Sequence, residues 1–225
     1  MFYGEFAYAI LAPLTILGVI VLAVLALSGR SEPDTRGERA YVLYLSLVSF
    51  IALFTIVFAL ANLSSTATHS LIDGADECLD PYSPECIEGP GFDSGSGGEV
   101  RVREAIDASA VALVAIGVLV LHRRRTRRLV DDPGFPGSAA ARTFGAYLYA
   151  VSFTAIALII GATAIALPAL VRAIGPGLTA LGSPSAERDG AITDLVPALV
   201  TGGVSLAIYL THWRAADRLR RGDEG

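Results

Sequence analysis

The chain has 225 residues, of which 53% are hydrophobic and only 17% are charged. A soluble domain is typically about 45–50% apolar and about 25% charged, so this composition argues against a soluble globular protein. The apolar residues fall into long runs without alternation. This excludes an outer-membrane β-barrel, because strands of such a barrel are about ten residues long and alternate in polarity.

Five apolar runs are long enough to cross a hydrocarbon core of about 30 Å as helices, at about 1.5 Å per residue. In chain order they are residues 6–27, 41–63, 105–121, 144–171 and 195–211. We expect helices because lipid offers the backbone no hydrogen bonds, and a helix satisfies its own. The first run is expected to be a retained span, because the N-terminus before it has no basic residue. The predicted fold class is an all-α membrane protein.

The placement of arginines predicts the orientation of these spans. All 17 basic residues are arginines, and cytoplasmic loops of membrane proteins are enriched in Lys and Arg. With the N-terminus outside, the cytoplasmic segments contain Arg30, Arg36, Arg39, Arg123, Arg124, Arg125, Arg127, Arg128, Arg142, Arg214, Arg218, Arg220 and Arg221. The outer segments contain only Arg101, Arg103, Arg172 and Arg188. The alternation holds at every crossing, so we expect five transmembrane helices with the N-terminus out and the C-terminus in.

The segment 64–104 is predicted to be a long, acidic outer loop. His69 is expected to be a solvated residue of this loop. The only two cysteines of the chain, Cys78 and Cys86, also lie in it. Disulfides persist outside the cytoplasm, and the two prolines between the cysteines favour a compact loop. We therefore predict a Cys78–Cys86 disulfide rather than a metal site, which would need more ligands than the nearby carboxylates.

The second and fourth spans are similar in sequence at an offset of 103 residues. Residues 39–62 and 142–165 are identical at ten of 24 positions without a gap. The informative matches are Arg39 with Arg142, Tyr44 with Tyr147, and the run Val-Ser-Phe at 48–50 and 151–153. Apolar helices match by composition alone, so these polar and aromatic matches indicate a duplication.

The third and fifth spans match at an offset of 90 residues. Both end in the pattern His-x-Arg-x-x-x-Arg-Leu, beginning at His122 and at His212. Each unit is therefore a helical hairpin of the same orientation, so the repeat is parallel, with its axis along the membrane normal. We predict an N-terminal helix in residues 1–30, a first hairpin in 38–130 with the cysteine loop, and a second hairpin in 140–221.

At these residues the chain resembles bacterial multi-pass proteins that carry an uncharacterised membrane domain. The resemblance rests on an Arg-x-Tyr-x-x-Tyr-Leu helix start, here Arg39, Tyr41, Tyr44 and Leu45, and a His-Trp-Arg helix end, here His212, Trp213 and Arg214. In the other copies Phe144 replaces the first tyrosine and Arg123 replaces the tryptophan. The resemblance implies a bacterial inner-membrane location and no activity.

Ionisable residues in the middle of a span usually mark function. None lies in the middle of the five runs, because Asp107, in the third run, sits near its end. His122 and His212 lie at equivalent span ends, which leaves two interpretations open. They could be axial ligands of a haem, since helical bundles house such sites. The favoured interpretation is that each histidine anchors a helix end near the lipid headgroups, so that no cofactor is bound.

Aromatic and basic residues at the cytoplasmic span ends are expected to anchor the helices in the interface, because amphipathic rings and cations prefer that region. The predicted anchors are Arg39, Tyr41, Tyr44, Arg142, Phe144, Tyr147, Trp213 and Arg214. The arginine cluster at 123–128 is expected to bind anionic lipids rather than nucleic acid.

No nucleophile motif, zinc signature or nucleotide-binding loop occurs in the sequence. The favoured hypothesis is therefore a non-enzymatic membrane protein that acts as a scaffold or accessory subunit, with membrane-protein partners or further copies of itself. The alternatives are a haem-binding electron carrier and an uncoupled channel or transporter. The last hypothesis predicts a polar path through Ser49, Thr55, Ser152 and Thr163.

Overall fold

The computed structural model of the chain describes residues 37–73, 96–175 and 184–222, together with residues 16, 18–20 and 24. Four long helices account for almost all of these ranges: α2 (Glu38–Asp73), α4 (Ser96–Val130), α5 (Ala139–Ile174) and α6 (Pro184–Gly222). No strand occurs in the described ranges, which confirms the all-α prediction. Each of the four helices is long and apolar enough to cross a membrane.

Two predictions fall on residues that the structure does not describe. Most of the first predicted span, residues 6–27, lies outside the described residues, so the count of five spans stays a prediction. Cys78 and Cys86 also lie outside them, and their disulfide stays a prediction.

Every helix is longer than the apolar run that predicted it. Helix α2 continues past residue 63 to Asp73, because its polar residues bond to their own helix: Ser64, Thr68 and Ser70 donate to the carbonyls of Ala61, Ser64 and Thr66. His69 therefore lies in a helix, and its placement in a loop was wrong. Helices of 35 to 39 residues are about 50–60 Å long, so their ends extend beyond a hydrocarbon core of about 30 Å.

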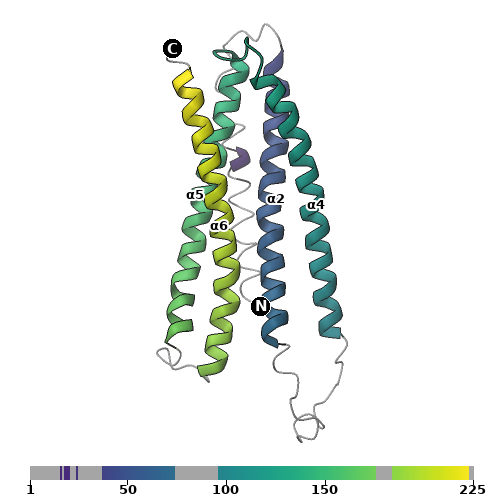
Figure 1. Cartoon of the computed structure of the whole chain (residues 1–225), viewed down its shortest axis with the longest axis vertical. Coiled ribbons are helices and arrows are strands. Elements are labelled where there is room, and N and C mark those ends of the chain that lie inside the picture. Colours follow the sequence, from purple (N-terminus) through teal and green to yellow (C-terminus); the bar gives the residue numbers. More distant parts are fainter. Residues whose placement is uncertain are drawn as a thin grey trace, which may run out of the picture.

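The four helices run lengthwise beside one another as two antiparallel hairpins, α2–α4 and α5–α6 (Figure 1). Helix α2 also packs on α5 and α6, whereas α4 packs chiefly on α2. Helices α2 and α5 begin, and α4 and α6 end, at the same end of the bundle, the upper end in Figure 1. We call this the arginine-rich end, because the described residues there include Arg39, Arg123, Arg124, Arg125, Arg127, Arg128, Arg142, Arg214, Arg218, Arg220 and Arg221.

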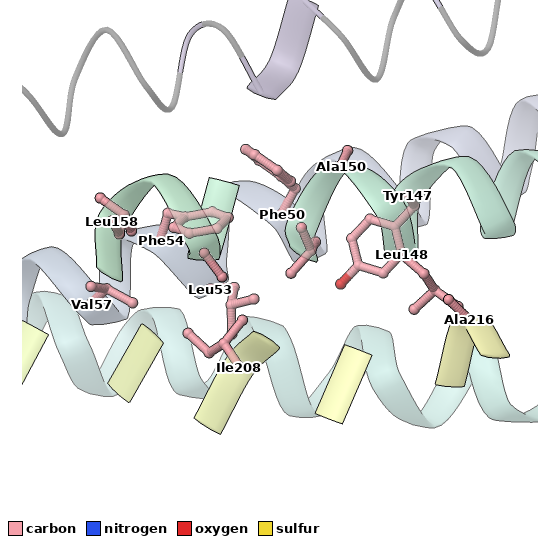
Figure 2. Close-up of a cluster of buried hydrophobic side chains, with 12 residues drawn as sticks. Phe50, Leu53, Phe54, Val57, Tyr147, Leu148, Ala150, Leu158, Ile208 and Ala216 are labelled. Atoms are coloured by element: carbon pink, nitrogen blue, oxygen red, sulfur yellow. The ribbon is translucent and has the colours of Figure 1, made fainter. Parts of the chain in front are cut away.

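The buried core lies between α2, α5 and α6 (Figure 2). Its largest fully buried side chains include Phe50, Leu45 and Val57 of α2 and Val151 of α5. Helix α4 adds only partly buried Leu119 to this cluster. Three of the four helices therefore form the packed body, and α4 lies at its side.

A short connection closes the arginine-rich end between α4 and α5. Phe135 is buried and packs with Val42 of α2 and with Phe144, whose ring meets it edge-on at 6.2 Å. Gly137 has a φ of 75°, a left-handed conformation that glycine adopts without steric cost. Ser138 then caps α5, because its hydroxyl oxygen accepts a hydrogen bond from the Ala141 amide at 3.1 Å. This gives a partner to one of the backbone amides that are left unpaired at a helix start.

Gly18, one of the few described residues of the first predicted span, approaches the bundle closely. A Cβ atom at this position would lie 2.3 Å from Cζ of Phe50 and 2.8 Å from Oγ1 of Thr154. Val19 beside it packs on the same core. Contact this close needs a glycine, so this segment meets α2 and α5 at one point.

Candidate functional site

An outer chamber of about 870 Å³ opens at the arginine-rich end. It lies between the last turns of α4 and α6, the α4–α5 connection and the first turns of α5. The arginines on its lining are Arg123, Arg127, Arg142, Arg218 and Arg220. Asp131 is the one acidic residue on this lining. The chamber therefore carries a strong excess of positive charge.

An inner chamber of about 370 Å³ adjoins the outer one and is lined by all four helices. Both chambers share Arg123 and Thr126 of α4, Phe144 of α5 and Ala215 of α6. Both volumes fall in the range of about 300–1,000 Å³ that is typical of small-molecule sites. Two adjoining chambers thus lead from the arginine-rich end towards the packed core.

Three side chains on the inner lining carry hydroxyl groups for which no hydrogen bond to the described part of the chain is found. They belong to Ser46, Ser49 and Tyr147, which are 3%, 6% and 6% exposed. Other buried hydroxyls behave differently, since Ser152 and Thr154 donate to the carbonyls of their own helix at 2.8 and 2.9 Å. Because these three residues line the chamber, their hydroxyls are available to hydrogen-bond a polar ligand.

His212 presents one ring nitrogen to the inner chamber. Its Nδ1 lies 2.9 Å from the Ile208 carbonyl oxygen, which can only accept, so Nδ1 carries the proton and Nε2 is left for another partner. The ring meets that of Tyr147 edge-on, with centroids 6.0 Å apart. Arg123 of α4 lies on the same lining as these two side chains. Residues from three helices thus converge on the inner chamber.

His122 has the corresponding arrangement in the first hairpin. Its Nδ1 donates to the Val118 carbonyl at 2.9 Å, and its ring lies 5.9 Å from that of Tyr44. The Nε2 atom is buried without a partner. Among the described residues, each histidine ring contacts the tyrosine of its own hairpin and not the other histidine. The structure therefore does not bring the two predicted haem ligands into ring contact.

The predicted interface anchors fall into two groups. Tyr41, Tyr44 and Trp213 are 40%, 54% and 48% exposed, as expected for side chains at the membrane surface. Tyr147 is buried and Phe144 is partly buried, and both line the inner chamber. These two rings therefore face the interior of the bundle, and their role as interface anchors stays a prediction. The three arginine anchors, Arg39, Arg142 and Arg214, lie at the arginine-rich end.

The four hydroxyl residues proposed for a polar path do not line one passage. Ser49 lines the inner chamber, whereas Thr55 lines a separate groove between α2 and α4. Ser152 and Thr163 donate to carbonyls of α5. Sequence analysis missed Ser46, and the chamber role of Arg123, although the spacing of three residues between Ser46 and Ser49 places both on one helix face.

The described residues contain no group of three or more His, Cys, Asp or Glu side chains that could hold a metal ion. The fold and the chambers together define a helical protein with four candidate membrane spans and an arginine-lined cavity at one end. Comparison of the chain with protein-family models, with curated proteins and with solved structures gives no match. What the chain can bind therefore follows from the chemistry of its own side chains.

Proposed function

We propose that this chain is a multi-pass protein of the bacterial inner membrane with five spans, and that its arginine-rich end faces the cytoplasm. The charge distribution supports this orientation. The described residues at the opposite end include only Arg101, Arg103, Arg172 and Arg188, interspersed with acidic residues such as Asp107 and Asp194. Arginine and lysine are retained on the cytoplasmic side during insertion.

The proposed architecture is a duplicated hairpin with the first span at its side. Two contacts that recur at aligned positions support it. Tyr44 with His122 and Tyr147 with His212 form similar ring contacts at 5.9 and 6.0 Å. In both hairpins the histidine Nδ1 bonds the carbonyl four residues earlier. Independent sequences would not be expected to repeat both contacts at the same offsets.

The proposed function is that of a non-enzymatic binding protein, which serves as a scaffold or accessory subunit and engages anionic lipid headgroups at its cytoplasmic end. The observation that carries this proposal is the outer chamber with five arginines on its lining. A cluster of cations at the membrane surface attracts acidic lipids by about 1 kcal/mol per residue. Within the described part of the chain, Arg123, Arg127 and Arg220 form no ion pair that would neutralise them.

Labelling of cysteines with a membrane-impermeant maleimide in intact cells tests the orientation. After reduction, Cys78 and Cys86 should react from outside, whereas a Gly225→Cys variant that lacks both native cysteines should react only after the cells are opened. Reaction of both positions from the same side would contradict the proposed topology. Without reduction, the native cysteines should not react, because we predict that they form a disulfide.

Native mass spectrometry after extraction in a mild detergent tests the binding function. We expect anionic phospholipids to remain bound in preference to zwitterionic ones. A variant with Arg127→Gln, Arg218→Gln and Arg220→Gln should lose this preference, whereas Arg101→Gln with Arg103→Gln, at the opposite end, should keep it. The same spectra show whether the chain carries a second copy or another subunit, and a lipid-free monomer would count against the proposal.

The absorption spectrum of the purified protein tests the haem alternative. We expect no Soret band, because each histidine ring packs against the tyrosine of its own hairpin. A Soret band that disappears in both His122→Ala and His212→Ala would establish the electron-carrier hypothesis instead.

A further inference from the structure

We propose that the inner chamber is a specific binding site for an amphiphilic anion, a phosphate or carboxylate group attached to an apolar chain. The proposal deepens the proposed function and rests on it for the side from which the ligand enters. It differs from general lipid contact, because it assigns the anionic group to named side chains inside the bundle.

The polar side of the inner chamber is suited to an anion. Arg123 supplies a guanidinium, and the hydroxyls of Ser46, Ser49 and Tyr147 are donors that nothing in the described part of the chain occupies. Among the described residues, no acidic side chain lines this chamber. Hydrogen bonds from such donors to a charged oxygen are roughly twice as strong as those between neutral groups. A cation would be repelled by Arg123 and would find no carboxylate among the described lining residues.

The apolar side of the inner chamber is suited to a hydrocarbon chain. Leu53 of α2, Leu119 of α4, Leu148 of α5 and Ile208 of α6 line it. Deeper in the bundle, Phe54, Val57 and Leu158 belong to the packed core (Figure 2). A ligand that carries both an anionic and an apolar group satisfies the two sides of the lining together, whereas inorganic phosphate alone would leave the apolar side uncovered.

The two chambers and α4 together provide an entry route. The outer chamber gathers arginines and would raise the local concentration of anions, and Arg123 lies on the lining of both chambers. Helix α4 packs chiefly on α2 rather than on α5 or α6. An amphiphile can therefore pass along the arginines with its charged group while its chain remains near the apolar side of α4.

The test uses the full chain in nanodiscs of phosphatidylcholine, with radiolabelled dodecyl phosphate as the probe and empty nanodiscs as the baseline. Arg123→Gln should weaken binding about tenfold, which corresponds to about 1.4 kcal/mol. Arg124→Gln is the matched control, because this neighbouring arginine lines neither chamber, and binding should stay within about twofold. Tyr147→Phe keeps the ring and removes the hydroxyl. It should weaken binding about threefold, as expected for one hydrogen bond, whereas Tyr44→Phe should have no effect.

Two outcomes would overturn the proposal. Equal losses in Arg123→Gln and Arg124→Gln would assign binding to the charged surface, which leaves the proposed lipid contact intact. Equal binding of dodecanol and dodecyl phosphate would show that no anion is recognised. The proposed topology is tested independently of this site, because cysteine labelling in cells measures it and the affinity of the purified protein does not.

Two competition experiments identify the source of the anion if the site is confirmed. If a membrane lipid supplies the anionic group, phosphatidylglycerol in the nanodisc should displace the probe from the wild-type chain. If a soluble amphiphile supplies it, dodecanoate added from the aqueous phase should displace the probe from the chain in phosphatidylcholine nanodiscs. Either displacement supports the site if it is absent in the Arg123→Gln variant.

Discussion

The two hairpins have similar sequences at aligned positions but different environments. In α5–α6, Tyr147 is buried and His212 faces the inner chamber. In α2–α4 the exposure is reversed, since Tyr44 is 54% exposed and His122 is 7% exposed. Phe50 of α2 is fully buried, whereas the aligned Phe153 of α5 is 55% exposed. Equivalent residues have thus taken different roles.

The cause of this difference is the position of α4. Helices α5 and α6 pack on each other and both contact α2, while α4 packs chiefly on α2 alone. Large apolar side chains such as Leu113 and Val114 of α4 are 70% and 69% exposed, which lipid allows. The bundle is therefore asymmetric.

The largest effect is expected from truncating the aligned phenylalanines. Phe50→Ala should lower the free energy of unfolding by about 3–5 kcal/mol, because it opens a cavity in the core. Phe153→Ala removes the same group from an exposed site and should cost less than about 1 kcal/mol. Titration with a denaturing detergent measures both. Equal losses would mean that the two hairpins are packed alike.

A smaller loss is expected where Gly18 meets both hairpins. Gly18→Ala would place a Cβ atom against fully buried Phe50, whose ring cannot move away, and should cost about 1–3 kcal/mol. Gly203→Ala is the matched control, because open space surrounds that position in α6. Thermal unfolding in detergent compares them. An unchanged midpoint for Gly18→Ala would contradict the close contact of Gly18 with α2 and α5.

The hairpins also differ at the end opposite the arginine-rich one. In the second hairpin, Arg172 of α5 pairs with Asp194 of α6 at 2.8 Å, with side chains 35% and 28% exposed. In the first, Arg101 of α4 donates to the carbonyl of His69, at 3.4 Å. A double-mutant cycle of Arg172→Gln and Asp194→Asn should give a coupling of about 0.5–1 kcal/mol. Additive losses would show that the pair does not hold α5 to α6.

The smallest effect is expected for Ser205 of α6. It is fully buried and its hydroxyl has no partner, whereas the aligned residue of the first hairpin is Ala115. Ser205→Ala should leave stability within about 0.5 kcal/mol of the wild type, with a shift toward greater stability, because it removes an unpaired polar group. A loss of more than about 1 kcal/mol would indicate that this hydroxyl has a partner in the membrane.

The sequence alone determined the helical class, the positions of four helices and the separation of charge along them. Long apolar runs admit only helices in lipid, and arginines at 123–128 and 214–221 cannot lie within the hydrocarbon. The helix ends were less predictable, since polar residues such as Thr68 and Ser70 stay helical by bonding to their own backbone.

Only the tertiary structure decided which side of each helix faces the protein. In a soluble protein an apolar stripe marks the core, but a helix in lipid is apolar all round, so hydropathy does not distinguish interior from exterior. Nothing in the repeated Val-Ser-Phe run indicates that Ser49 lines a chamber while Ser152 bonds to its own helix. That difference arises from the neighbours of each helix, because α2 lies among three partners and α5 leaves one side uncovered.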